Sequence, residues 1–383
     1  MKIKQRPEDF YVEELTDVQP LSEGEFALYR LEKRGWTTPD AVQVIRQRWK
    51  LDGRRISFGG LKDRHAHTIQ YLTIWRGPQR QLTHQGIHLQ YLGRLSEPYT
   101  SHHFRGNRFR LVIRALTETE LEPAVTALGE VRRDGVPNYY DDQRFGSVSG
   151  GEFVAKALVL GDFERALQLA LCAPYEHDRA AQKREKQILR SHWGDWPACQ
   201  AKLPRGQTLA VIDFLVRQPG DFRGAMVRLR PELGSLYMSA YQSHLWNRML
   251  ARWLREHLEP SQLLSGHWPM HRQLNDVQRA ELTALQLPLP TARGQVEPTD
   301  PRVILMSAIL AEDGLTREQM KVKGVRELFF SRGERTALCM PADLTHESGE
   351  DECNEGRKKL VLGFDLPRGC YATLIVKRLF GDR

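Results

Sequence analysis

The sequence contains few cysteines for its length, and they are scattered. There are five among 383 residues, namely Cys172, Cys199, Cys339, Cys353 and Cys370. An odd number without a Cys-x-x-Cys pair argues against a disulfide framework and a zinc module, and is typical of a reducing compartment. The histidine pairs at 65/67 and 102/103 have no cysteine or carboxylate at ligand spacing. We therefore expect no metal site.

Long apolar runs are also absent. The first residues, MKIKQR, lead into acidic residues without the apolar segment of a signal peptide, and no run reaches the roughly 20 apolar residues that cross a bilayer. A glycine-rich phosphate loop followed by Lys-Ser/Thr is missing as well. We expect a cytoplasmic protein with no membrane contact, no obligatory protein partner and no bound cofactor.

Positive charge is abundant. The formal net charge is +8 and the isoelectric point is about 9.2. Between residues 51 and 110, ten Lys and Arg residues face three acidic ones, a local charge of +7. Such a basic segment indicates a polyanionic partner, although a solvated charged face would have the same composition.

The strongest chemical signal is a carboxylate within this basic segment. β-branched and aromatic residues predict strands over Arg55–Gly59 and Ile69–Trp75, with a polar loop between them. The loop holds Asp63 between Lys62 and Arg64. Because adjacent positive charge stabilises an ionised carboxylate, Asp63 is a candidate nucleophile or base at the end of a sheet.

Hydrophobic periodicity indicates a mixed α and β chain with more than one core. A chain of 383 residues, 40% of them hydrophobic, is long enough for two domains. The first 150 residues are mainly strands. Their predicted helices begin at Thr38, taken as the cap, and at the capping box of Thr117 and Glu120. Helical patterns dominate from residue 151, and an acidic mobile loop is predicted over Glu347–Gly356.

Two further segments are candidate RNA contacts. Val136–Gly146 is rich in aromatic and amide side chains and contains Arg144. It either covers the edge of a core or stacks an unpaired base. Asp178–Arg190 is a predicted basic helix that includes Lys183, Arg184 and Lys186. It is either a solvated face or a second RNA contact.

The loop around Asp63 resembles the G-x-K-D-x-x-A-x-T-x-Q signature of the TruD family of RNA pseudouridine synthases, over Gly60–Gln70. Five other segments match the same family in the same order along the chain. They are Lys4–Glu14 (KxxPEDFxVxE), Gly106–Phe109 (GNxF), Val136–Gly146 (VPNYYxxQRFG), Ala240–Asn247 (AxQSxxxN) and Leu366–Thr373 (LPxGxYAT).

This resemblance implies an α+β fold and a substrate. The expected catalytic domain is discontinuous, over residues 1–150 and 342–383, with a mixed, mainly antiparallel pseudouridine-synthase sheet. A largely helical TRUD-type domain is expected as an insertion over residues 151–341. The implied activity is isomerisation of a uridine in tRNA, at position 13, to pseudouridine.

The resemblance also assigns roles to residues. Asp63 takes the catalytic position, where it either attacks C1′ of the sugar or removes a proton from C2′. Lys62 and Arg144 are expected to keep Asp63 ionised and to contact phosphate. The remaining implied substrate-binding residues are Lys4 and Glu14 beside the pocket and Phe10, Asn138, Tyr140 and Tyr371 around the uracil.

Two tyrosines depart from the family pattern. Phenylalanine is usual where this chain has Tyr140 and Tyr371, so each ring gains a hydroxyl. That hydroxyl either assists proton transfer at C5 or forms a hydrogen bond at the rim of the pocket.

Two other functional classes fit the bare residues. In the first, Lys62 forms a Schiff base with an abasic sugar, as in DNA lyases. In the second, the protein binds RNA without catalysis and Asp63 only orients Lys62 and Arg64. Trapping of a DNA adduct with borohydride would identify the first class, and activity retained after Asp63→Asn would favour the second.

Overall fold

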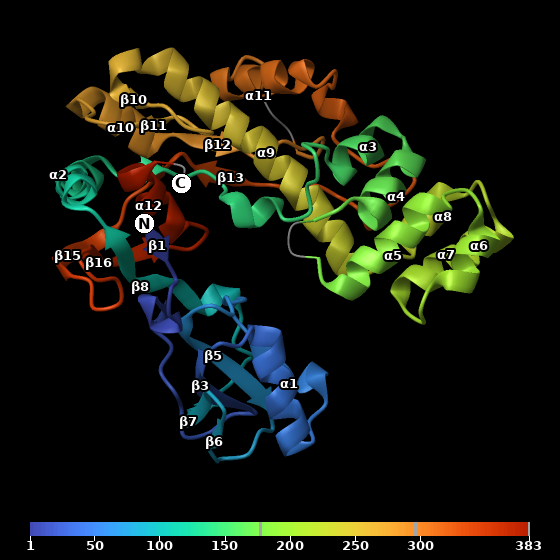
Figure 1. Cartoon of the computed structure of the whole chain (residues 1–383), viewed down its shortest axis with the longest axis horizontal. Helices are drawn as coiled ribbons and strands as arrows, with labels where there is room; N and C mark the ends of the chain where they lie inside the picture. Colours follow the sequence, from blue (N-terminus) through green and yellow to red (C-terminus); the bar gives the residue numbers. More distant parts are fainter. Residues whose placement is uncertain (176–177, 295–296, 382–383) are drawn as a thin grey trace. The chain divides into compact units, whose positions relative to one another are not determined.

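The computed structural model describes residues 1–175, 178–294 and 297–381. The chain forms two compact units, Met1–Val136 with Cys339–Arg383, and Pro137–Leu338 (Figure 1). The first unit is therefore assembled from both ends of the chain. Residues 137–150, which the sequence analysis assigned to the first domain, belong to the second unit, since their side chains and backbone bond to residues there.

The first unit is built on one large sheet. Its strand order is β15-β16-β8-β2-β5-β3-β7-β6, with β1 added beside β8 and β4 beside β5. The strands are β1 (Lys2–Ile3), β2 (Phe10–Thr16), β3 (Phe26–Arg34), β4 (Ile56–Phe58), β5 (His67–Trp75), β6 (Leu82–His84), β7 (Ile87–Leu95), β8 (Phe104–Leu116), β15 (Ala342–Glu350) and β16 (Lys358–Pro367). Among the described pairings only β2 and β5 are parallel. The predicted mixed, mainly antiparallel sheet is thus confirmed.

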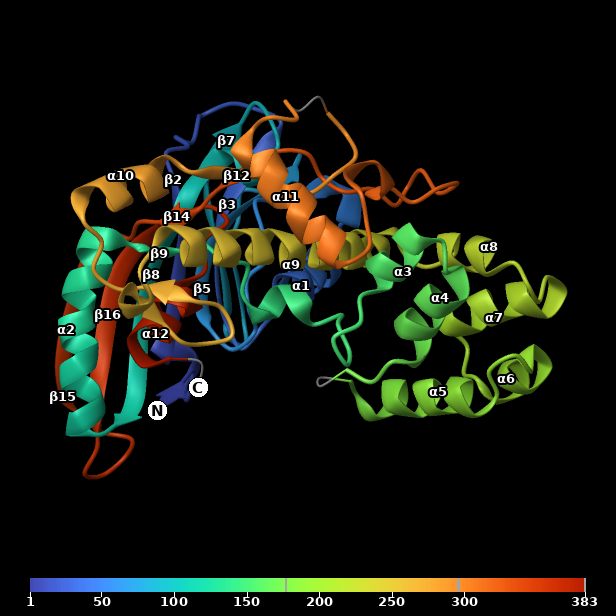
Figure 2. The same ribbon diagram turned by 90° about the horizontal axis from the view of Figure 1, so that it is seen from above.

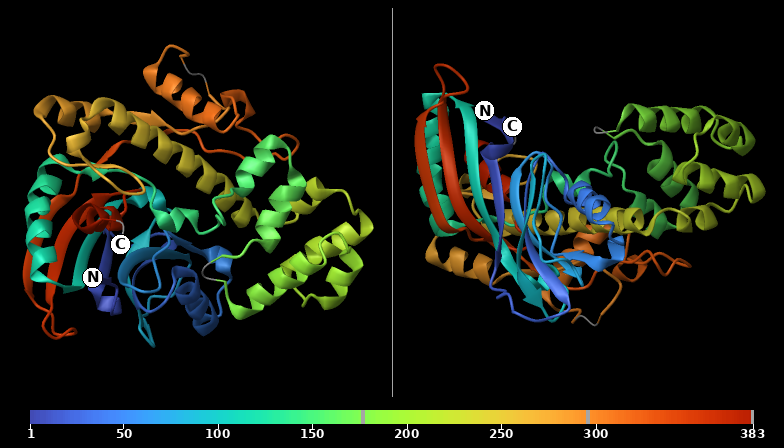
Figure 3. Two further views of the ribbon diagram at one scale, coloured as in Figure 1. Left: turned by 45° about the horizontal axis from the view of Figure 1, so that its top comes forward. Right: turned by 90° about the horizontal axis from the view of Figure 1, so that it is seen from below.

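Helices α1 (Thr38–Trp49), α2 (Glu118–Asp134) and α12 (Ala372–Phe380) belong to the same unit. Buried residues of α1, Ala41 and Ile45, join a core with inward side chains of β3, β5 and β7. The teal helix α2 runs along the red strands β15 and β16, with α12 beside it (Figures 2 and 3). The predicted capping box of α2 is present, because Glu120 accepts a hydrogen bond from the backbone of Thr117 at 2.9 Å.

The second unit is largely helical, as predicted. Its helices are α3 (Val154–Leu160), α4 (Phe163–Cys172), α5 (Ala180–Ser191), α6 (Trp196–Lys202), α7 (Gln207–Arg217), α8 (Phe222–Val227), α9 (Pro231–His257), α10 (Asp276–Ala284) and α11 (Pro301–Glu312). Its short strands are β10 (Leu263–Leu264), β11 (Met270–His271), β12 (Gln286–Pro288) and β13 (Glu334–Thr336), and β9 (Val136–Pro137) and β14 (Leu338–Cys339) lie where the chain passes between units. Helices α3 and α11 pack against the long helix α9, and α4 to α8 form a compact group (Figure 2).

The acidic segment near the C-terminus is ordered, contrary to the prediction of a mobile loop. Glu347 to Glu350 belong to β15 and pair with β16. Asp351 is 4% exposed and lies 2.9 Å from the buried guanidinium of Arg114. A buried cation therefore fixes a turn that its composition alone would leave in solvent. None of the described helices is long and apolar enough to cross a membrane.

Candidate active site

Strands β2 and β5 pair in parallel, so the chain segments at their N-terminal ends lie side by side at one end of the strands. Tyr11 lies opposite His67, so the residues just before these two positions are neighbours. Lys4 lies in the segment before β2, Phe10 is the first residue of β2, and the segment before β5 is the loop that holds Asp63. The first and the central sequence motifs therefore meet here, although about sixty residues separate them.

Lys4 forms an ion pair with the Asp63 carboxylate. Its Nζ lies 2.9 Å from Oδ2 of Asp63 and 4.1 Å from the ring centre of Phe10. The backbone of Lys4 has a φ of +61°, a left-handed conformation that non-glycine residues seldom adopt and that is often found at functional sites. The Asp63 side chain is 44% exposed. A substrate can thus reach a carboxylate that is ion-paired with an ammonium group.

Lys62 contacts a different carboxylate from the one predicted. Its Nζ lies 3.0 Å from Glu14 and donates to Oδ1 of Asn107 at 2.8 Å. The side chains of Lys62 and Glu14 are only 9% and 0% exposed. Burial raises the pKa of Glu14, whereas the charge of Lys62 acts in the opposite direction. Lys62 therefore anchors the loop to β2 and β8, and its contact with phosphate stays a prediction.

A buried lysine that the sequence analysis did not single out holds the backbone of the loop. Lys33 is 0% exposed, and its Nζ donates to the carbonyl oxygens of Trp36 at 2.7 Å, Lys62 at 3.3 Å and Asp63 at 2.9 Å. Burial lowers its pKa to about 8, although the charge of Asp63 opposes this shift. One signal in the sequence could have indicated that Lys33 is buried. It lies two residues after Leu31 and four after Tyr29 in β3, so it points to the same buried face of the strand as they do.

Two polar side chains complete the support of the loop. Thr38 accepts a hydrogen bond from the backbone N–H of Lys62 at 2.9 Å and donates to Gln70 at 2.8 Å. The Gln70 amide donates to the carbonyl oxygen of Gly60 at 3.0 Å. Thr38 was predicted to cap α1, but Thr37 does so, by accepting from a backbone N–H of the first turn. The hydroxyl of Thr38 is therefore used to hold the loop that carries Asp63.

The basic segment is less positive in space than in sequence. Five of its ten cations pair with carboxylates, and four of those carboxylates come from outside the segment. The pairs are Arg54 with Asp52, Lys62 with Glu14, Arg64 with Asp40, Arg76 with Glu25 and Arg108 with Asp365. Hence Arg64, predicted to flank Asp63, directs its guanidinium to Asp40 at 2.6 Å.

Three predicted substrate-binding residues lie in the second unit. The Asn138 amide donates to the carbonyl oxygen of Thr336 at 3.1 Å, and its Oδ1 accepts from Arg335 at 2.7 Å. The guanidinium of Arg335 lies 4.1 Å from the ring centre of Tyr140, and that of Arg144 lies 5.3 Å from it. Tyr140 thus has two cations at its ring, and no motif in the sequence pointed to Arg335.

The predicted site residues therefore fall into groups. Lys4, Phe10, Glu14, Lys62 and Asp63 come together in the first unit. Tyr371, half-buried at the start of α12, belongs to that unit as well. In the described ranges no group of three or more His, Cys, Asp or Glu side chains is arranged to hold a metal ion.

The comparisons with known proteins agree with the sequence motifs. The family model described as tRNA pseudouridine synthase D (TruD) matches residues 1–379. A probable tRNA pseudouridine synthase D of Methanococcus maripaludis is 30% identical, with 99% of each chain covered. A tRNA pseudouridine synthase D of Aquifex aeolicus is 29% identical, over 99% of this chain and 98% of the relative.

A solved structure supports the same relationship. The crystal structure described as a TruD protein from Methanosarcina mazei superposes with a TM-score of 0.74 at 25% identity and covers 100% of this chain and 94% of its own. Because the family model spans nearly the whole chain and a relative matches it end to end, this protein belongs to the tRNA pseudouridine synthase D family.

Proposed function

We propose that this protein isomerises a uridine of tRNA, at position 13, to pseudouridine, with Asp63 as the catalytic carboxylate. Membership of the family makes the chain an RNA pseudouridine synthase, an isomerase. The reaction breaks the bond between N1 of the base and C1′ of the sugar, turns the uracil, and joins it through C5, which then loses its proton while N1 gains one. It needs a carboxylate at the sugar and no external donor or oxidant.

The observation that carries this proposal is the contrast between Asp63 and its surroundings. The Asp63 carboxylate is 44% exposed and lies beside the ammonium of Lys4. The backbone of the same loop is held by Lys33, Thr38 and Gln70. A reactive group on a fixed backbone satisfies the requirement that the attacking atom be positioned before the reaction begins.

Both chemical routes use the same arrangement. In one, an Asp63 oxygen attacks C1′ as uracil leaves, and uracil later displaces it through C5. In the other, the carboxylate removes the C2′ proton and returns it after the base has turned. Either route uses the exposed carboxylate that lies beside the ammonium of Lys4. The proposed uracil contacts are Phe10 in the first unit, Tyr371 in α12, and Asn138 and Tyr140 in the second unit.

The test replaces the carboxylate and maps the product. Asp63→Asn and Asp63→Ala should lower pseudouridine formation in an unmodified tRNA transcript by more than about 1,000-fold, with tRNA binding retained. Asp40→Asn is a matched control, since Asp40 is equally exposed at 43% and also ion-paired, and it should keep parental turnover. Turnover within tenfold of the parent in either Asp63 variant would show that another group does the chemistry. Product mapped elsewhere than position 13 would refute the proposed target.

The alternative with Lys62 as a Schiff-base nucleophile is weakened by the geometry. An amine that attacks a sugar must be accessible and neutral, whereas Lys62 is 9% exposed and ion-paired with Glu14. Borohydride should therefore trap no adduct between the protein and abasic DNA. A protein that only binds RNA would still bind tRNA but would form no pseudouridine.

A further inference from the structure

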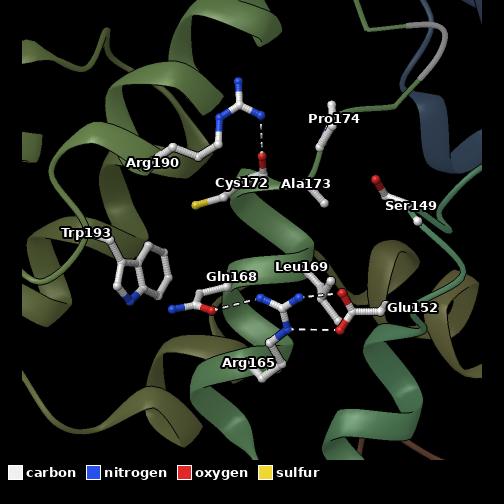
Figure 4. Close-up of a pocket in the computed structure, with 11 residues that line it drawn as sticks. Ser149, Glu152, Arg165, Gln168, Leu169, Cys172, Ala173, Pro174, Arg190 and Trp193 are labelled. Atoms are coloured by element: carbon white, nitrogen blue, oxygen red, sulfur yellow. Dashed lines mark hydrogen bonds and ion pairs between the residues drawn. The ribbon is translucent and has the colours of Figure 1, made fainter.

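The helical group of the second unit contains a pocket that the proposed reaction does not use (Figure 4). Its volume is about 340 Å³. This is near the lower end of the range of about 300–1,000 Å³ for small-ligand sites, and suits one base with its sugar. The walls come from α4, from the C-terminal end of α5, from the turn that follows α5, and from the segment before α3.

One side of the pocket is a fixed indole above an apolar floor. Leu169 and Cys172 are buried at the end of α4 and form the floor. The Trp193 indole donates to Glu164 at 3.0 Å and lies edge-on to Trp196, with ring centres 5.0 Å apart. Because these contacts hold its orientation, the indole can stack a planar base at little entropic cost.

Among the residues that line the pocket, the polar groups supply one amide and one guanidinium without a described carboxylate partner. Arg165 is ion-paired with Glu152, so that pair is neutral overall. Arg165 also donates to Oε1 of Gln168 at 3.2 Å, and the Gln168 amide nitrogen is on the side of Trp193 (Figure 4). Arg190 donates to the carbonyl oxygen of Cys172 at 3.1 Å and has no carboxylate partner among the described residues.

Basic side chains continue from the pocket along α5. Lys183, Gln187 and Arg190 are spaced i, i+4 and i+7, so they share one face of the helix. Lys183 and Arg190 are exposed. Lys186, which the sequence placed in the same basic helix, is instead buried at 2.6 Å from Asp178. The available positive charge thus extends beyond the pocket along one line.

Other ligands fit this arrangement less well. Burial raises the pKa of the Cys172 thiol to about 12, so the thiol is neutral and unreactive at physiological pH. A free nucleoside triphosphate would place about four negative charges beside a single unbalanced guanidinium. A nucleotide within a chain has one negative charge, and its neighbouring phosphates can lie along α5.

We infer that this pocket binds one unpaired nucleotide of the RNA substrate, with its base against Trp193, its edge beside the Gln168 amide and its phosphate beside Arg190. The inference rests on the proposed function to the extent that RNA is the substrate. It adds a second point of recognition, on the unit that does not carry Asp63.

The test measures tRNA affinity in the full-length protein by filter binding over a range of salt. Trp193→Ala should weaken binding of an unmodified tRNA about tenfold, and Trp193→Phe, which keeps an aromatic face, by less than about threefold. Arg190→Gln keeps a donor for the Cys172 carbonyl but removes the charge, and should reduce the salt slope by about 0.7. Arg217→Ala is the control, since Arg217 is also exposed and bonded to a backbone carbonyl, and should bind as the parent does.

The outcomes separate this inference from the proposed function. If pseudouridine forms but the Trp193→Ala and Arg190→Gln variants bind tRNA like the parent, the pocket proposal is overturned and the reaction stands. If no pseudouridine forms but these variants bind tRNA weakly, the pocket proposal stands without the reaction. If the variants lose affinity only for uridine 5′-monophosphate and not for tRNA, the pocket binds free nucleotides and the proposal is overturned.

Discussion

At the scale of single residues, the charge partners around Asp63 are set by the tertiary fold and not by sequence proximity. Lys62 and Arg64 flank Asp63 in sequence, yet the first pairs with Glu14 and the second with Asp40. Lys4, 59 positions from Asp63, contacts its carboxylate. Adjacent side chains on an extended loop point in different directions, so sequence neighbours need not be charge partners.

The buried pair of Glu14 and Lys62 makes a prediction about stability. Lys62→Met leaves the Glu14 carboxylate buried without its cation and should lower the free energy of unfolding by roughly 3–5 kcal/mol at pH 8. Burial raises the pKa of Glu14 above its unfolded value, so its unfavourable contribution disappears as the pH falls and the carboxyl becomes protonated. Urea denaturation of the variant should therefore show a smaller loss at pH 5 than at pH 8.

The double variant provides the control for this pair. Glu14→Gln combined with Lys62→Met removes both charges and should recover most of the stability lost in the single variant. A double variant as unstable as Lys62→Met, with the same pH dependence, would mean that the loss comes from packing and not from an unpaired carboxylate.

At the scale of elements, the loop between β4 and β5 is held in place by hydrogen bonds with residues of β3 and α1. Lys33 of β3 and Thr38 of α1 bond to its backbone, and Gly59 at its start is packed closely. A Cβ atom on Gly59 would lie 2.8 Å from the ring of Phe104, so only glycine fits without movement of that ring. The loop lacks regular structure, yet its position is determined by these neighbours.

Lys33 should make turnover sensitive to alkaline pH. Its pKa is lowered to about 8, so above that pH the side chain becomes neutral and has two donors for three carbonyl oxygens. We expect kcat of the parent to fall as the pH rises through about 8. The Lys33→Met variant should have a lower kcat with little change in KM for tRNA, and should lack this alkaline fall.

The stability of the same variant supplies an independent check. The folded pKa of Lys33 lies below the unfolded value of about 10.4, so folding gains stability relative to Lys33→Met as the pH rises from about 8 to 10.4. Thermal melts of both proteins across that range measure the difference. A variant that keeps the alkaline fall in kcat would assign that fall to another group.

At the scale of the whole molecule, the chain leaves one unit and later returns to complete it. Strand β16, from the end of the chain, pairs with β8 along most of its length, and β15 pairs with β16. The first unit therefore cannot form its sheet until the last 45 residues are available. The second unit, Pro137–Leu338, is a continuous stretch and contains its own core.

This second unit should be sensitive to acid because of His244 in α9. Burial among aromatic rings lowers the pKa of His244 to about 4, and its ring centre lies 4.7 Å from that of Phe153. The unfolded state binds the proton at about pH 6.5, so the stability from this group is full above that pH and is lost as the pH falls towards 4. The loss is at most about 3 kcal/mol, since one pKa unit corresponds to about 1.36 kcal/mol.

Replacement of the histidine separates this effect from general acid denaturation. His244→Phe should melt with a smaller decrease between pH 7 and pH 5 than the parent, as followed by circular dichroism. His346, in β15 of the first unit and exposed, provides the control substitution, and His346→Phe should leave the acid dependence of melting as in the parent. Equal acid dependence in the parent and in His244→Phe would rule out His244 as the source.

The sequence by itself determined the family, the α+β class, several helices of the second unit and the candidacy of Asp63. These follow from local signals, since periodicity, capping residues and motif spacing are properties of short segments. The tertiary structure alone decided which cation lies beside Asp63, that Lys33 holds the loop, and that Asp351 is buried with Arg114. Each of these contacts joins residues brought together by strand pairing, above all by the parallel register of β2 and β5. No pattern in a single segment encodes such a partner, because its choice depends on how the rest of the sheet assembles.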